Sequence, residues 1–372
     1  MNAVQFEVVL LVVAVAAACA VPGVYLVLRR LALVGDAISH VLLFGIVVAY
    51  FLVRDLDSPW LMAGAALSGV LTVALVELLQ RTGLMKEDAA IGLVFPALFA
   101  AGTLLASMYF RQTHLDVDQV LLGSAEQVYQ TQRVYFGSVY VRQPTLIMIG
   151  MFAVNVGLVA VFYKELKLST FDPALAASLG FLPGVLHYGL MTAVSLTTVA
   201  AFDAVGPVLV VAFLVVPAMT AYLLTDRLSR MLVLSVLIGA AAAVAGVMLA
   251  FRLDTNTAGT VAAVLGLVFG VVFLLAPGRG LLSQVLRRWR QRREFHVTML
   301  AIHLHQHEGT PAEADEARAD GLHRHLYWTP AEVAGVVARA ERGGVVTRAG
   351  ELLKLTDEGR RRAREVLGER PA

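Results

Sequence analysis

Cysteine and charge are both scarce in this sequence, and each shortage excludes a class of protein. The only cysteine is Cys19, inside an apolar run, so this chain alone forms neither an internal disulfide nor a thiolate metal cage. Charged residues make up 16% of the chain and hydrophobic residues 58%. Soluble domains have roughly 25% charged residues and a little under half apolar ones. The apolar excess must face something other than water, and lipid is the natural candidate.

A nucleotide-binding signature is also missing. No stretch matches G-x-x-x-x-G-K-[ST], and the four lysines lack the glycine-rich context that cradles phosphates. The formal net charge is only +2, which gives no basis for predicting a nucleic-acid partner. We therefore predict that the chain is not an enzyme.

Long apolar runs are what the sequence does contain. About 20 apolar residues cross a bilayer core as a helix, and nine windows meet or approach this length. The windows cover residues 6–28, 33–53, 60–79, 89–110, 146–163, 182–201, 205–224, 231–251 and 257–275. Only three residues separate the sixth window from the seventh, so eight spans with a broken or re-entrant segment is the alternative to nine. The first window lacks a basic leader and is predicted to be retained.

Basic residues indicate the direction of the spans, because cytoplasmic loops carry an excess of lysine and arginine. The loops after spans one, three, five and seven hold eight such residues, and the loops after the even-numbered spans hold five. The segment after span nine adds six arginines between residues 279 and 293. We therefore predict a multi-pass protein of the plasma membrane with an external N-terminus and a cytoplasmic C-terminal region.

Residues 35–40, Gly-Asp-Ala-Ile-Ser-His, place two ionisable side chains inside the second span. Asp36 and His40 are four residues apart, which puts them on one helix face about 6 Å apart. Ionisable groups are costly within a span and are functional hypotheses by default. A carboxylate and an imidazole make half of a site for a divalent transition metal, and an ion pair is the alternative. A complete metal site needs a second copy of the motif from a partner chain.

The same motif resembles an early signature of the ABC-3 family of metal-ion permeases, the membrane subunits of manganese, zinc and iron importers. Other segments match that family in the same order along the chain. They are residues 87–92, 121–124, 171–176 with Gly180, 205–207 with 214–218, and 254–259. Leu122 stands where the family has phenylalanine, and Asn256 stands where proline is usual. These two departures affect the external loops.

The resemblance implies a homo- or heterodimer of membrane subunits with a metal pathway at their interface. It implies two ABC ATPase subunits on the cytoplasmic side and an extracytoplasmic metal-binding solute-binding protein. Asp36 and His40 are then the pathway ligands, and two copies supply four. The divalent metal is transported substrate, with manganese favoured over zinc or iron, and no permanently bound cofactor is expected. ATP hydrolysis belongs to the separate ATPase.

The loop from Lys164 to Gly180 gains a role from this resemblance. Asp172 and Pro173 are typical of a helix start, with an acid near the N-terminal dipole and proline in the first turn. A short helix here would dock in a groove of the ATPase and carry its motion into the spans, whereas an ordinary capped helix is the alternative. The predicted coupling residues are Phe171, Asp172, Pro173, Ala174, Leu175, Ala176 and Gly180.

The composition changes sharply near residue 281. Residues 1–280 are predicted to form the transmembrane permease domain, 281–293 a basic linker suited to anionic lipid, and 294–372 a cytoplasmic domain. The last contains a predicted helix with a capped start at residues 329–332, a hairpin around residues 349–350 and a final helix. This order resembles the winged helix of diphtheria-toxin-repressor-type regulators. We favour dimer contact or regulation over DNA binding, so nucleic acid is not expected as a partner.

The predicted fold class is thus an all-α polytopic membrane protein of eight or nine transmembrane helices with a small C-terminal α+β winged-helix-like domain. Residues 303–325 of the tail also hold five histidines, and histidine-rich tracts often bind metal. They are His303, His305, His307, His323 and His325. Bound metal there would report the cytoplasmic metal level and inhibit transport. Alternate residues of a helix point to different faces, so one site needs a loop or a second subunit, and a solvated polar face is the alternative.

Two other functions fit part of the pattern. An ion-coupled secondary transporter predicts several buried acidic residues along the spans, whereas Asp36 is the main one here. A membrane-anchored metal sensor would have the tail as its principal part. Binding of a partner ATPase separates the first from an ABC importer, and metal uptake after removal of residues 294–372 separates the second.

Overall fold

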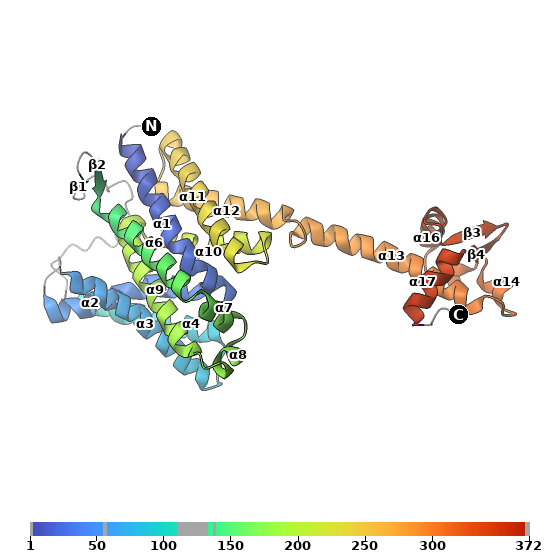
Figure 1. Cartoon of the computed structure of the whole chain (residues 1–372), viewed down its shortest axis with the longest axis horizontal. Helices are drawn as coiled ribbons and strands as arrows, with labels where there is room; N and C mark the ends of the chain where they lie inside the picture. Colours follow the sequence, from blue (N-terminus) through green and yellow to red (C-terminus); the bar gives the residue numbers. More distant parts are fainter. Residues whose placement is uncertain (1–2, 55–57, 110–132, 137–138, 369–372) are drawn as a thin grey trace. The chain divides into compact units, whose positions relative to one another are not determined.

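The structure is a computed structural model that describes residues 3–54, 58–109, 133–136 and 139–368. Two compact units divide the chain at the expected change of composition, Met1–Gly280 and Leu281–Ala372 (Figure 1). The segment 121–124, one of those that resemble the permease family, lies outside the described residues.

Long apolar helices build the first unit. Among the described residues, nine helices are long and apolar enough to cross a membrane, which confirms the prediction of an all-α polytopic membrane unit. They are α1 (Ala3–Leu28), α2 (Ala32–Val53), α3 (Pro59–Arg81), α4 (Glu87–Tyr109), α6 (Gln143–Val161), α9 (Pro183–Val205), α10 (Pro207–Leu224), α11 (Leu228–Leu253) and α12 (Thr257–Leu275). A hairpin of β1 (Arg133–Phe136) and β2 (Val139–Arg142) precedes α6, and α7 (Tyr163–Phe171) and α8 (Pro173–Ser178) lie between α6 and α9.

The break between the sixth and seventh spans lies at Gly206. Helix α9 ends at Val205 and α10 begins at Pro207, and Gly206 between them has a φ of 79°. Glycine adopts positive φ readily, and proline is favoured at the first position of a helix. The expected break around residues 202–204 is instead part of α9, where Asp203 is exposed. Two full helices therefore occupy the stretch for which a broken span was the alternative.

Helix α1 is the central element of the membrane unit. It packs against α6, α9, α10 and α11, and most of its length is buried (Figure 1). Small residues let membrane helices approach closely. At Gly23 the approach is so close that an added Cβ would lie 2.0 Å from the backbone oxygen of Leu214. This packing holds the N-terminal helix in the interior and leaves α2, α3 and α4 to form one flank.

Helix α2 packs on α3 through a pair of glycines, one on each helix. A Cβ added at Gly45 would lie 2.4 Å from the backbone oxygen of Gly64 and 2.6 Å from Ser68 Oγ. A Cβ added at Gly64 would lie 2.5 Å from the Cβ of Ala49. The two helix backbones are therefore in contact, and α2 is held rigidly along the part that follows the Asp36 and His40 motif.

We expect Gly45→Ala to destabilise the membrane unit, because the new methyl group would force the α2 and α3 backbones apart. Overpacking of this kind costs about 1–3 kcal/mol. Gly150→Ala is the matched control, since nothing lies within 4 Å of the Cβ added at that α6 position. Alanine is the better helix former, so this control should leave stability unchanged or raise it. Thermal unfolding of the purified chain in detergent measures both, and equal midpoints for the two variants would contradict the close contact.

The second unit is a small α+β fold with its own core. Its elements are α13 (Leu281–His307), α14 (Glu313–Glu316), α15 (Leu322–His325), α16 (Pro330–Arg342), β3 (Val346–Ala349), β4 (Leu352–Leu355) and α17 (Asp357–Leu367). Strands β3 and β4 form the expected antiparallel hairpin, with Val346 opposite Leu355. The expected helix start is present as a capping box of Thr329 and Glu332. The order helix, hairpin, helix is confirmed, and the winged-helix resemblance stays a prediction.

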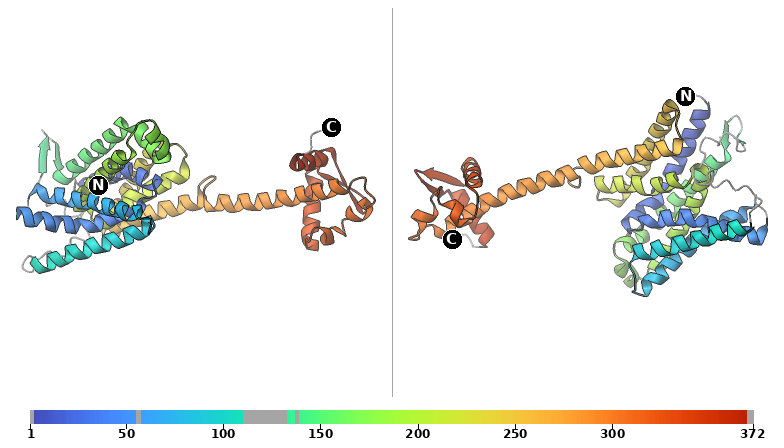
Figure 2. Two further views of the ribbon diagram at one scale, coloured as in Figure 1. Left: turned by 90° about the horizontal axis from the view of Figure 1, so that it is seen from below. Right: turned by 180° about the vertical axis from the view of Figure 1, so that it is seen from behind.

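The basic segment 281–293 is helical. It forms the first half of α13, which runs unbroken from Leu281 to His307 (Figure 2). This stretch contains neither glycine nor proline and is rich in leucine, arginine and glutamine, which are good helix formers. The segment predicted as a linker is therefore the start of α13, which begins at Leu281.

Candidate functional site

Asp36 and His40 lie on one face of α2, as their spacing predicts. Helix α2 begins at Ala32, so at 1.5 Å per residue the two side chains are about 6 and 12 Å along it. His40 Nε2 is 3.6 Å from Asp36 Oδ1, which is the distance of a loose ion pair. This geometry fits an ion pair and also fits two ligands of one metal ion, because the Asp36 carboxylate and the His40 imidazole direct their polar atoms to one point.

Two aromatic rings of α4 hold the His40 imidazole. Phe95 stacks on it with ring centroids 5.8 Å apart, and Phe99 meets it edge-on at 6.0 Å. Such contacts limit the rotation of the ring. Helix α4 therefore fixes the direction in which His40 presents its nitrogens, and α2 fixes its height relative to Asp36.

The pair is only half-buried in the single chain. The side chain of Asp36 is 46% exposed and that of His40 is 35% exposed, although both belong to a membrane span. A carboxylate facing lipid is costly, so ionisable groups in spans almost always face a bundle interior or a water-filled cavity. Among the described residues of the membrane unit, no third histidine, cysteine or acidic group joins them to make a metal-holding cluster. The arrangement is thus a pair of polar side chains on the outside of the single chain, and its role as half of a metal site stays a prediction.

A second polar cluster joins the end of α1 to α7. Arg29 Nε donates to Thr170 Oγ1 at 3.1 Å, and Nη2 donates to Ser169 Oγ at 3.0 Å. Its third nitrogen, Nη1, lies 3.3 Å from Nδ1 of His187 on α9. The cluster borders a cavity of about 540 Å³ that is lined by the ends of α1, α3, α7 and α9. The guanidinium therefore clamps three elements at one end of the bundle.

Sequence reasoning missed this cluster. In the sequence, Arg29 is only one of the basic residues that indicate the cytoplasmic side. Glu77 at the same cavity accepts hydrogen bonds from the Tyr188 hydroxyl and, at 2.7 Å, from Arg81. Glu77 and Tyr188 are 111 residues apart in sequence, and Arg29 and His187 are 158 residues apart. No local sequence pattern therefore reveals these contacts.

The segment around Asp172 forms the short capped helix that the sequence predicts. Asp172 Oδ1 accepts from the backbone N–H of Leu175 at 2.9 Å, and Pro173 occupies the first turn of α8. Ala176 is fully buried against the bundle. The other predicted coupling residues, Phe171, Asp172, Pro173, Ala174, Leu175 and Gly180, are exposed. Phe171, Leu175 and Leu179 therefore give this helix an apolar face that no other part of the described chain covers.

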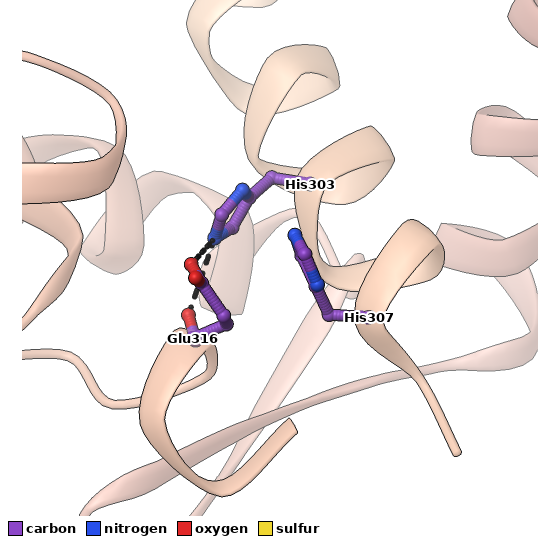
Figure 3. Close-up of side chains that lie close together, drawn as sticks. All are labelled: His303, His307 and Glu316. Carbon is purple, nitrogen blue, oxygen red and sulfur yellow. Dashed lines mark hydrogen bonds and ion pairs between the residues drawn. The ribbon is translucent and has the colours of Figure 1, made fainter. Parts of the chain in front are cut away.

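The five histidines between residues 303 and 325 divide into two sets. His303 and His307 lie one turn apart on α13, opposite Glu316 of α14 (Figure 3). His325 of α15 is next to the same glutamate. His305 is directed elsewhere, with Nδ1 3.7 Å from Glu308, and His323 Nδ1 is 2.7 Å from the backbone oxygen of Asp320. Burial lowers the pKa of His303 and so favours its neutral form. Sequence reasoning missed Glu316.

Comparison with known proteins places these features in a family. The ABC 3 transport family matches residues 1–276. The zinc transport system membrane protein TroD of Treponema pallidum is 44% identical over 353 residues, which are 95% of this chain and 96% of that protein. The manganese transport system membrane protein MntD of Bacillus subtilis is 42% identical over 282 residues, 76% of this chain and 95% of that protein.

A solved structure supports the same assignment. PsaBC from Streptococcus pneumoniae in complex with Fab has a TM-score of 0.62 and 26% sequence identity, covering 75% of this chain and 94% of that one. The match to TroD extends over both units, whereas the matched length of MntD leaves no room for the second unit. Since the family match covers residues 1–276 and both relatives are more than 40% identical to this chain over most of its length, the chain belongs to the ABC 3 transport family.

Proposed function

We propose that this chain is the membrane-spanning permease subunit of an ATP-driven importer for a divalent transition metal. One observation carries the proposal: a carboxylate and an imidazole share one face of a membrane helix and are half-exposed on the surface of the single subunit. Family membership supports it, and so do the names of the relatives, which state zinc and manganese transport.

Two subunits complete the pathway in this proposal. A second copy, or a related permease chain, brings its own aspartate and histidine against Asp36 and His40, so that four ligands surround one cation. Contact between the two subunits also removes the exposed carboxylate from lipid, which is favourable. The same contact therefore creates the metal pathway and stabilises the dimer.

The apolar face of α8 is the proposed contact for the ATPase. The exposed leucines and phenylalanine, beside the capped start of α8, form a short hydrophobic surface on a rigid helix. The Arg29 cluster ties the preceding helix, α7, to the turn between α1 and α2. Motion of a docked ATPase is thereby passed to α2, which carries the ligand pair. ATP hydrolysis itself occurs in that separate subunit.

The remaining parts of the proposal concern the cargo and the sides of the membrane. Oxygen and imidazole ligands suit manganese, zinc and iron alike. We favour manganese as the transported metal, and zinc and iron are the alternatives. The N-terminus lies outside, where a solute-binding protein delivers the metal, and the C-terminal unit lies in the cytoplasm. This orientation follows from the excess of basic residues in the loops assigned to the inside.

The test is metal uptake by cells that lack their own importers. Uptake of at least one of the three metals should require this chain, its ATPase and its solute-binding protein together. Uptake that persists without the ATPase and collapses when the proton gradient is dissipated would identify a secondary transporter instead. Unchanged uptake after removal of residues 294–372 would reject the proposal that the tail regulates transport. If the truncated chain instead loses only a response of the cell to metal, the protein is a membrane-anchored sensor.

We expect Leu175→Glu to abolish binding of the ATPase, because a charge at the centre of a buried apolar contact costs several kcal/mol. The measurement is co-purification of the ATPase with the tagged chain. Leu253→Glu is the matched control, since this leucine is also exposed but ends α11 on the opposite side of the membrane in the proposed orientation. Equal recovery of the ATPase with both variants would show that α8 is not the docking site.

A further inference from the structure

Three potential metal ligands meet in the second unit, far in sequence from the transport pair. His303 and His307 project from the same face of α13, and Glu316 projects toward them from α14 (Figure 3). One ligand atom from each lies within 4.8 Å of the other two. His303 Nε2 and Glu316 Oε2 are 3.3 Å apart. Ligands at 2.0–2.1 Å from a tetrahedral zinc ion are about 3.3 Å from each other, so this edge already has the required length.

Burial sets this cluster apart from a solvated polar face. The side chain of His303 is 11% exposed and that of Glu316 is 20% exposed. Glu316 Oε2 is buried and, among the described residues, has no partner in hydrogen-bond geometry. His303 Nε2 at 3.3 Å and His325 Nδ1 at 2.9 Å are within ion-pair distance of it, although neither forms a well-directed hydrogen bond. Buried carboxylate oxygens are normally satisfied, and a cation would satisfy this one.

We propose that His303, His307 and Glu316 bind one divalent transition-metal ion of the zinc class, with His325 as the fourth group beside Glu316. Two or three imidazoles and one carboxylate are a typical zinc donor set, whereas manganese and magnesium prefer oxygen. In the metal-free state His303 Nε2 is also 3.2 Å from the backbone oxygen of Glu316, to which a protonated nitrogen donates. A metal ion at Nε2 would replace this hydrogen bond, and the neutral imidazole would then carry its proton on Nδ1.

The surrounding fold holds the ligands in place. Leu353 of β4 donates its backbone N–H to the oxygen of Ala317 at 2.9 Å, which fixes the residue next to Glu316 against the hairpin. His303 and His307 stand on the last turns of α13, whose Leu300 and Leu304 are in the core of the unit. A bound ion would therefore cross-link the C-terminal end of α13 to the segment that carries α14 and α15.

The consequence for transport rests on the proposed function. If the second unit is cytoplasmic, this site meets metal that has already entered the cell, and occupancy provides a signal for lowering import. Binding itself does not depend on that role. The site also differs from the transport pair in its ligands, because three of its four groups are histidines.

The test is metal binding by the full-length chain in detergent after removal of metal with a chelator. Bound zinc per chain is counted, and Co²⁺ is used as a spectroscopic probe because its visible bands report tetrahedral coordination. The chain should bind one zinc equivalent that Asp36→Ala retains and that His303→Ala combined with His307→Ala loses. His305→Ala combined with His323→Ala is the matched control and should retain it, since those two histidines lie outside the cluster.

Two further measurements keep the outcome independent of misfolding. Glu316→Gln keeps the shape of the side chain and should weaken zinc binding by about 10- to 100-fold without loss of helix content. Zinc should also raise the unfolding temperature of the unmodified chain, because a ligand that binds only the folded state stabilises it. Absence of a tetrahedral cobalt spectrum in the unmodified chain, or equal zinc loss in the control, would overturn the proposal. Loss of uptake with retained zinc binding would affect only the transport proposal.

Discussion

We expect Asp36→Asn and His40→Gln each to abolish metal uptake while the assembled complex keeps its basal ATP hydrolysis. Both substitutions preserve side-chain size and remove a metal ligand or its charge. Groups that merely orient metal ligands are worth about 10- to 100-fold, so losing a ligand itself is expected to cost about 100-fold or more. The measurements are accumulation of manganese, zinc and iron in cells, and stimulation of ATP hydrolysis by each metal in the reconstituted complex. Stimulation should disappear together with uptake.

Asp203→Asn is the matched control for the aspartate. It removes the same charge from another exposed carboxylate in a membrane helix, near the end of α9. Uptake should stay within about twofold of the unmodified chain, because surface substitutions away from special features have small effects. Unchanged accumulation of all three metals in the Asp36→Asn and His40→Gln double variant would exclude the pair from the pathway. Equal losses in the control would show a general effect of charge removal.

We expect Arg29→Ala to uncouple ATP hydrolysis from transport. The substitution removes the contacts with Ser169, Thr170 and His187, and so disconnects α7 from the turn that leads into α2. Coupling between sites is typically worth 1–3 kcal/mol, so uptake per ATP hydrolysed should fall by about tenfold. ATPase binding should be retained, because α8 and its cap are untouched. Parallel assays of uptake, ATP hydrolysis and co-purification measure the three quantities.

Arg30→Ala provides the control for this second prediction. Arg30 is the next residue, carries the same charge and is exposed at the border of the same cavity. Its loss should leave the ratio of uptake to ATP hydrolysis unchanged. If both alanine variants lower the ratio equally, the positive charge of the turn matters and the directed hydrogen bonds of Arg29 do not. If neither lowers it, α7 is not the transmitting element.

Local signals were sufficient for the elements. Runs of apolar residues predict the spans, because a helix that crosses a bilayer needs a fixed length of apolar surface. Asp172 followed by Pro173 predicts the start of α8, and Thr329 with Glu332 predicts the capping box of α16, since caps depend on neighbours in sequence. The shared face of Asp36 and His40 follows from helix periodicity alone.

Tertiary contacts were beyond such signals. The clamp by Arg29 joins residues about 140 positions apart, so its partners depend on how the helices pack. Glu316 lies in an acidic stretch with Glu313 and Asp315, and only the fold distinguishes the one that faces the histidines. The five histidines look equivalent in sequence, whereas the helix turns His305 away from His303 and His307. The basic segment 281–293, predicted as a linker, is helical from Leu281 because its residues are good helix formers despite their charge.

The half-exposed Asp36 has a consequence for biogenesis. A newly inserted subunit that has not met its partner presents a carboxylate to acyl chains or to water drawn into the bilayer. Such an orphan subunit is strained in a way that a paired one is not, and membrane proteases and chaperones act on that kind of defect. In the proposed dimer, pairing would therefore set the abundance of the permease, and cells that synthesise this chain in excess over its partner should clear the surplus rapidly.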